Sequence, residues 1–226
     1  MTTLPPAREH DPDPLTTRPS RLAPIAGLVY AVLMVASIAT SGGDTPDFGA
    51  PLNEWTKFAE ENGDGLRLSV VLFGPAVLAF GLFLRGLAAR LHSPGDDTTA
   101  IVVGGLLGVT GILLGLALGA IGAIHPDTSP EVLRAMSDLT GAGFVIAAPA
   151  FALMMITVFL LGRKTRGIPS WLSYVALACG VAFVLQLGTG LSDEFDNAFG
   201  AFYPIAFLLL LIFTIGASVV GLLRAR

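Results

Sequence analysis

Long apolar runs alternate with shorter polar segments along the chain from residue 22 onward. The runs without a charged residue are 22–40, 68–84, 100–124, 139–161, 171–191 and 199–223. An α-helix rises about 1.5 Å per residue, so roughly 20 residues cross the roughly 30 Å hydrocarbon core of a bilayer. Because a chain in lipid must satisfy its backbone hydrogen bonds internally, we predict that each run is a transmembrane helix.

The segments outside these runs predict smaller elements. Residues 1–21 are rich in proline and charge, and we expect a disordered cytoplasmic tail. In Pro51–Asn62 the apolar residues, Trp55 and Phe58 among them, recur at helical spacing, which predicts a short amphipathic helix on the outer interface. The Ser-Pro-Glu segment 129–131 is typical of a helix start. That helix either lies on the surface or continues into the fourth run.

Basic residues divide unequally between the two sides of the predicted bundle. If the N-terminus is cytoplasmic, the outer segments hold only Lys57, Arg67 and Arg134 of the 13 lysines and arginines. The others, all on the inner side, are Arg8, Arg18, Arg21, Arg85, Arg90, Arg163, Lys164, Arg166, Arg224 and Arg226. Because cytoplasmic loops are enriched in basic residues, we predict six helices with both termini inside, arranged as three helical hairpins. The end of the first run, Ser37-Ile38-Ala39, also resembles a signal-peptidase site, but cleavage there would disturb this alternation, so we predict a retained helix.

Composition supports a single membrane domain over residues 22–226. The chain has 226 residues, 53% hydrophobic and 13% charged, with a mean hydropathy of +0.74, whereas soluble domains carry about 25% charged residues. The net charge of −4 gives no basic excess, so nucleic acid is not expected as a partner. The single cysteine, Cys179, excludes an intramolecular disulfide and a cysteine-rich metal centre.

The predicted spans lack the residues that most membrane chemistry requires. None of them contains Lys, Arg, Asp, Glu or His. This absence argues against a proton-coupled transporter, a voltage sensor, a retinal protein and a haem protein with histidine ligands. The chain also has no H-E-x-x-H, Walker or G-x-S-x-G motif. We therefore expect no cofactor and no catalytic residue.

Glycines form a stripe along the third run. They are Gly104, Gly108, Gly111, Gly115, Gly119 and Gly122. Spacings of three and four place small residues on one helical face, where another helix can approach closely. The stripe indicates helix packing within the chain, a homo-oligomer interface or a ligand groove.

Polar side chains are few within the predicted spans. Gln186 is the only amide, Thr189 lies one turn farther along the same run, and Tyr203 lies near the start of the next. These residues indicate either hydrogen bonds between helices or a small ligand pocket open to the outer leaflet. Prolines free a carbonyl one turn earlier, so Pro75, Pro149 and Pro204 would offer acceptors at Val71, Val145 and Gly200 to such a pocket.

The outer helix ends carry one weak group of metal-ligating types. Its members are His125, Asp127, Asp193, Glu194 and Asp196. Histidine and carboxylate together suit a divalent cation, but no ligand spacing within a single loop supports a metal site, and solvated loop charge is the preferred interpretation.

Several segments together resemble a known class of protein. They are Asn53–Gly63 (NEWTKFAEENG), Arg67–Gly74 (RLSVVLFG), Phe83–Leu87 (FLRGL), Ile168–Leu172 (IPSWL) and Leu222–Arg224 (LLR). Over most of residues 22–226 the chain resembles an uncharacterised class of small six-helix integral membrane proteins of high-GC Gram-positive (actinobacterial) bacteria. The resemblance implies the six-helix fold and a bacterial plasma-membrane location, and it implies no activity.

The charge-free interior and the glycine stripe lead to a functional prediction. We expect a non-enzymatic membrane protein that binds lipid, a neutral or apolar small molecule, or a membrane partner protein, which includes a second copy of the chain. The alternative is a small channel or carrier for an uncharged solute, with a hydrated path lined by Gln186 and the hydroxyl groups. A third hypothesis is an enzyme that acts at the outer face through His125 and the neighbouring carboxylates.

Overall fold

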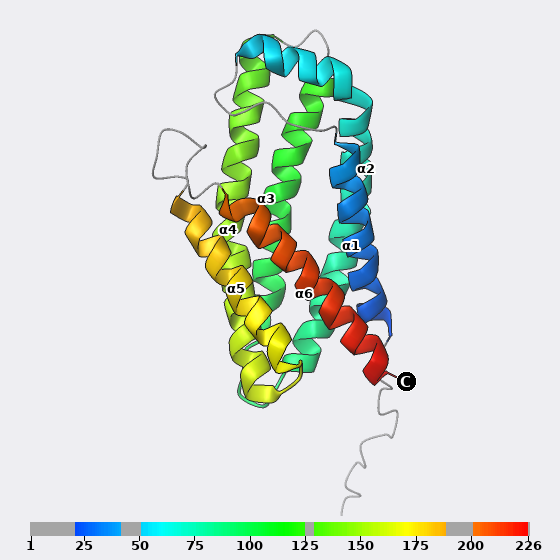
Figure 1. Cartoon of the computed structure of the whole chain (residues 1–226), viewed down its shortest axis with the longest axis vertical. Helices are drawn as coiled ribbons and strands as arrows, with labels where there is room; N and C mark the ends of the chain where they lie inside the picture. The colour runs from blue at the N-terminus through cyan, green and yellow to red at the C-terminus, as the bar shows by residue number, and fades with distance from the viewer. Residues whose placement is uncertain (1–20, 42–50, 125–128, 189–200, 226) are drawn as a thin grey trace, which may run out of the picture.

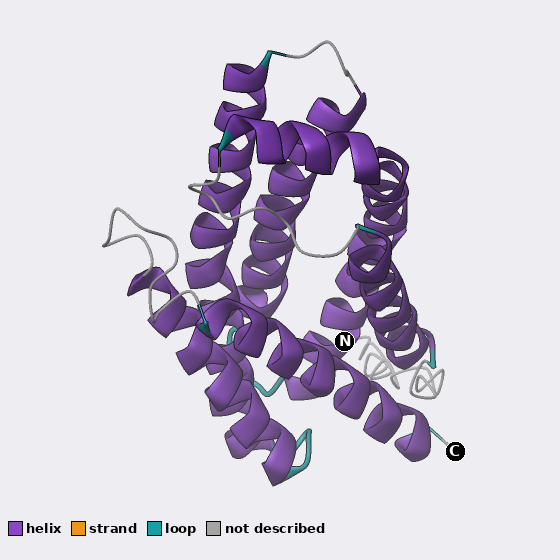
Figure 2. Ribbon diagram, turned by 45° about the horizontal axis from the view of Figure 1, so that its top comes forward, coloured by secondary structure: helices purple, strands orange, loops and turns teal. Residues whose placement is uncertain are grey.

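The computed structural model describes residues 21–41, 51–124, 129–188 and 201–225. Within these ranges the chain forms α-helices joined by short loops and no strand (Figure 1, Figure 2). The helices are α1 (Leu22–Thr40), α2 (Leu52–Leu91), α3 (Thr99–Ile124), α4 (Pro130–Thr165), α5 (Ser170–Gln186) and α6 (Phe202–Arg224). The predicted all-α fold class is therefore confirmed over the described residues. Residues 1–20 of the predicted tail lie outside them.

The six helices form a closed ring in chain order. Each helix packs against the helix that follows it in the chain, α6 packs against α1, and α2 also contacts α4. The most extensive of these interfaces lies between α3 and α4, which stand side by side as the two green helices of Figure 1. The partners within each predicted hairpin, α1 with α2, α3 with α4 and α5 with α6, are thus in contact.

Two helices are much longer than their predicted spans. Helix α2 has 40 residues and α4 has 36. The predicted amphipathic helix is not a separate element, because its residues form the first turns of α2, which run across the top of the bundle in Figure 1. The helix that starts after Ser129 continues into the fourth span, which decides between the two alternatives for that segment. Helix α5 ends at Gln186, before the predicted end at residue 191.

Four described helical stretches are long and apolar enough to cross a membrane. They are Leu22–Thr40, Glu60–Leu91, Ala142–Thr165 and Phe202–Arg224. Large apolar side chains, such as Val32, Val71, Ile146 and Leu208, are exposed on all four. Thr99–Leu114 and Ser170–Gln186 are apolar but shorter. By length and composition, the described chain therefore contains four candidate membrane spans, as suits a membrane protein.

Glycines bring α3 close to α4. A Cβ atom added to Gly104 would lie 2.7 Å from the Ala150 carbonyl oxygen, and one added to Gly111 would lie 3.1 Å from the Gly143 carbonyl oxygen. At Gly108 an added Cβ would lie 2.8 Å from the ring of Phe151. These three glycines thus face α4 within the chain. Gly115, Gly119 and Gly122 belong to α3, but their surroundings lie outside the described part of the structure.

Candidate functional site

Gln186 is buried at the end of α5. Its side chain is 3% exposed, and it lies on the helical face that also carries Cys179 and Phe183. The spacings of four and three residues place all three on the side of α5 that faces the bundle. A buried amide needs hydrogen-bonding partners, because it is no longer solvated by water. This turn of α5 is therefore a candidate ligand site.

Five aromatic rings from α4, α5 and α6 form a continuous group beside this face of α5. We call Phe144, Phe151, Phe183, Tyr203 and Phe207 the aromatic cluster. The Phe183 ring centroid lies 5.0 Å from that of Phe151 and 5.8 Å from that of Phe207. Tyr203 continues the chain of contacts, with its centroid 4.8 Å from Phe207 and 4.9 Å from Phe144. Offset and edge-on pairs at these distances are favourable aromatic contacts.

The structure brings two of the three predicted pocket residues to this cluster. Tyr203 is one of its members, and Gln186 lies one helical turn after Phe183. The third, Thr189, lies outside the described residues. The Cys179 thiol donates a hydrogen bond to the Ala206 carbonyl oxygen, with a distance of 3.3 Å between sulfur and oxygen, and so joins α5 to α6 on the same side.

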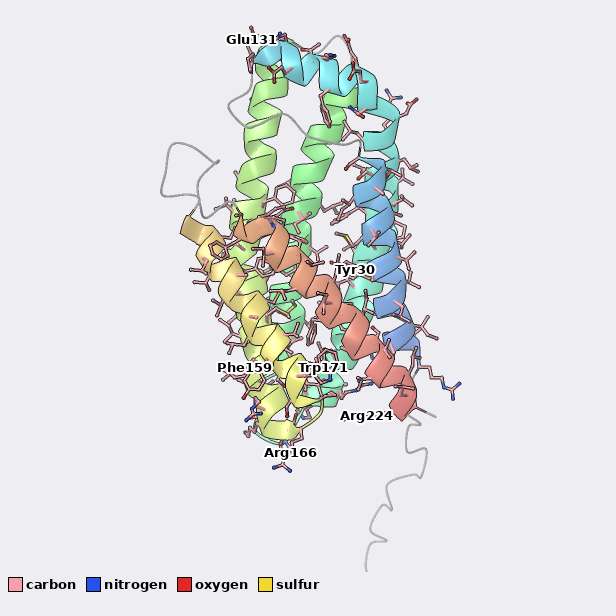
Figure 3. All side chains as sticks on the ribbon, viewed as in Figure 1. Tyr30, Glu131, Phe159, Arg166, Trp171 and Arg224 are labelled. Carbon is pink, nitrogen blue, oxygen red and sulfur yellow. The ribbon has the colours of Figure 1, made fainter. Side chains whose placement is uncertain are left out.

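Tyr30 is a buried tyrosine on α1. Its side chain is fully buried in the middle of α1, where Figure 3 labels it. The ring stacks on Phe80 with a centroid distance of 4.4 Å. Tyr30 thus joins α1 to α2 by an aromatic contact within the buried core.

The prolines play a smaller part than the sequence predicts. Pro204 lies in the first turn of α6, where a helix makes no use of the missing backbone N–H, so it frees no helical carbonyl. The predicted acceptor at Gly200 lies outside the described residues. Pro75 and Pro149 lie inside α2 and α4, but both are exposed on the outer surface of the bundle. A proline inside a helix bends it locally.

The predicted group of metal-ligating types at the outer helix ends falls between the described ranges. His125, Asp127, Asp193, Glu194 and Asp196 all lie outside the described residues. Over residues 21–41, 51–124, 129–188 and 201–225, no group of three or more His, Cys, Asp and Glu side chains is positioned to hold a metal ion.

The aromatic cluster was not predicted, although part of its signal is present in the sequence. Phe144 and Phe151 are seven residues apart, and Tyr203 and Phe207 are four apart, so each pair lies on one face of its helix. The contacts between the pairs depend on how α4, α5 and α6 pack. Together these residues offer aromatic surface and a few neutral hydrogen-bonding groups, which suits a ligand without charge. No protein-family model, no curated protein and no solved structure matches this chain.

Proposed function

We propose that the chain is a six-span protein of a bacterial plasma membrane, with both termini cytoplasmic, that binds a lipid or a neutral apolar molecule at the aromatic cluster. Such binding requires no catalytic group. The observation that supports this proposal is the burial of the Gln186 side chain, which is only 3% exposed. It lies one helical turn from the five rings of the aromatic cluster. A single buried amide beside aromatic surface can orient a ligand by one hydrogen bond while the rings bury its apolar part.

Helices α3 and α5 complete the six proposed spans. Helix α3 continues beyond Leu114 to Ile124 and has 26 residues, which corresponds to a length of about 39 Å. Helix α5 has 17 residues, or about 26 Å. Both lengths are close to the roughly 30 Å hydrocarbon thickness. With α1, α2, α4 and α6 they give an even number of crossings, so both ends of the domain lie on one side.

The charges at the two ends of the bundle support the proposed orientation. Arg166 and Arg224 lie at one end, and Glu131 lies at the other (Figure 3). Trp171 and Tyr174 are exposed near the basic end, and the Arg163 guanidinium lies 5.3 Å from the centre of the Tyr174 ring. Exposed Trp and Tyr next to basic residues are typical of the cytoplasmic membrane interface.

Replacement of Gln186 by leucine tests the proposed ligand site. We expect Gln186→Leu to abolish retention of a co-purifying lipid or small molecule, because the orienting amide is lost. The stability of the fold should change by about 1 kcal/mol or less, since hydrogen bonds between membrane helices average about 0.6 kcal/mol. The measurement is mass spectrometry of molecules bound to protein purified in mild detergent, together with the thermal unfolding midpoint.

Val184→Leu is the matched control. Val184 is exposed on the same helix, two residues from Gln186, so a new leucine there adds apolar surface without touching the site. This variant should retain the ligand as the wild type does. If Gln186→Leu retains the same molecules in the same amount, the amide only bridges helices and the proposed site is wrong.

A further inference from the structure

Two arginines at the basic end of the bundle are anchored by backbone carbonyls around the end of α6. Arg224 donates from Nη1 to the Gly167 carbonyl oxygen, at 2.7 Å, in the loop between α4 and α5. Arg21, just before α1, donates from Nη2 to the Ala225 carbonyl oxygen at 3.2 Å. Each of these guanidinium groups uses one N–H for the anchor and has further N–H groups to offer.

Arg90 of α2 is the third member of this group. Its half-buried side chain lies against α6, because a Cβ atom added to Gly221 would lie 2.8 Å from the Arg90 Nη2 atom. Gly221 precedes Arg224 by three residues, so it lies on the same face of α6. Gly167 is a second meeting point, since a Cβ added there would lie 2.7 Å from the Arg90 carbonyl oxygen. Arg224 donates to the carbonyl oxygen of this same Gly167, so the two arginines lie around one point of the loop.

No described carboxylate neutralises these three arginines. Across the described ranges, Arg21, Arg90 and Arg224 form no ion pair with an aspartate or a glutamate. The two described acids of the loop between α2 and α3 are engaged elsewhere. Asp96 pairs with Lys164 at 2.6 Å, and Asp97 accepts a hydrogen bond from the Thr99 amide at 2.7 Å. Arg90 and Arg224 both lie around Gly167 without a neutralising carboxylate, which favours a bound anion.

Exposed apolar residues adjoin the same arginines. Leu22 follows Arg21 on α1, Leu223 precedes Arg224 on α6, and each leucine is 60% exposed. Because α1 packs against α6, the change from apolar to cationic surface occurs on two neighbouring helices at the same end of the bundle. A phospholipid has the complementary arrangement, with an anionic phosphate next to acyl chains.

We propose that Arg21, Arg90 and Arg224 form a binding site for a phosphate oxyanion, and that the phosphate of an anionic phospholipid occupies it. Guanidinium groups bind phosphate oxygens through paired hydrogen bonds, and basic sites between helices at the cytoplasmic side bind lipid headgroups. Free phosphate would bind the guanidinium groups in the same way, but it has no acyl chain to contact Leu22 and Leu223. The site rests on the proposed membrane location but is separate from Gln186, so either binding proposal can fail without the other.

The test measures lipid binding by native mass spectrometry of the full chain in mild detergent, with phosphatidylglycerol, with phosphatidylcholine and with inorganic phosphate as a competitor. The wild type should prefer phosphatidylglycerol, and inorganic phosphate should not displace it. The double variant Arg90→Gln/Arg224→Gln should bind phosphatidylglycerol about tenfold more weakly or worse, as expected for lost charge-assisted contacts. The control Arg163→Gln/Arg166→Gln removes the same charge at the same end of the bundle and should bind like the wild type.

Three results would overturn the proposal. Equal losses in both double variants would mean that only general surface charge attracts the lipid. Equal affinity for the two lipids in the wild type would remove the anionic selectivity, and displacement by inorganic phosphate at the lipid's own concentration would exclude a lipid as the occupant. If the glutamine variant fails to fold, Arg90→Lys/Arg224→Lys keeps the charge but removes the paired geometry. That variant should still bind more weakly than the wild type, and unchanged affinity would contradict the site.

Discussion

Of three cysteines introduced one at a time, only the one that replaces Ser129 should react with an impermeant thiol reagent added to whole cells. Ser129 is exposed and precedes α4, next to Glu131 at the acidic end of the bundle. Cysteines at Ser93 and Thr165 lie in or next to the loops at the basic end and should be protected. The background is Cys179→Ala, because the native thiol would otherwise add its own signal. The mass of the purified protein shows whether each introduced cysteine has reacted with the reagent.

Permeabilised cells provide the control for this experiment. All three introduced cysteines should react once the reagent reaches both sides of the membrane. Labelling of the Ser93 or Thr165 variant in intact cells would reverse the proposed orientation. Labelling of all three variants in intact cells would show that the basic and acidic ends do not lie on opposite sides of a membrane.

The same substitution, glycine to alanine, should have opposite effects on stability at Gly104 and at Gly74. At Gly104 the new Cβ would lie 2.7 Å from the Ala150 carbonyl oxygen, so α3 or α4 must shift. Overpacking of this kind costs about 1–3 kcal/mol. At Gly74, inside α2, an added Cβ meets nothing within 4 Å, and alanine is the better helix former by up to about 1 kcal/mol.

Thermal unfolding in detergent measures this difference. We expect a lower midpoint for Gly104→Ala and an unchanged or higher midpoint for Gly74→Ala. Gly74 is thus a control with the same chemical change in a helix of the same protein. If Gly104→Ala unfolds at the wild-type temperature or above it, the close approach of α3 and α4 is not a constraint on the fold.

The helices could be predicted from the sequence far better than their ends. Charge-free runs mark the segments that need apolar surroundings, and each of the six lies largely within an observed helix. The predicted boundary between the amphipathic helix and the second span is wrong for a physical reason. The predicted amphipathic helix ends at Asn62, yet α2 runs on through Gly63 and Gly65, and a Cβ on Gly65 would overlap the Thr40 carbonyl oxygen of α1. At that position glycine permits a close contact between helices and does not end one.

The candidate site could be predicted only in part. Gln186 is conspicuous because it is the only amide in an apolar run, and Tyr203 stands out near a helix start. The contacts of Phe183 with Phe151 and Phe207 depend on the rotation of three helices about their axes. Helix α5 is apolar on all sides, so its sequence contains no pattern that fixes this rotation.

The ring of helices in chain order has a consequence for synthesis. Almost every interface joins helices that are consecutive in the chain, so each new helix can pack on the one made just before it. The exception that spans the whole domain is α1 with α6, where the Ser218 hydroxyl fills the space beside Gly27. Until α6 emerges from the ribosome, Gly27 has only Phe83 of α2 beside it. Assembly therefore ends with one late closing step, in which Ser218 of α6 comes to lie beside Gly27.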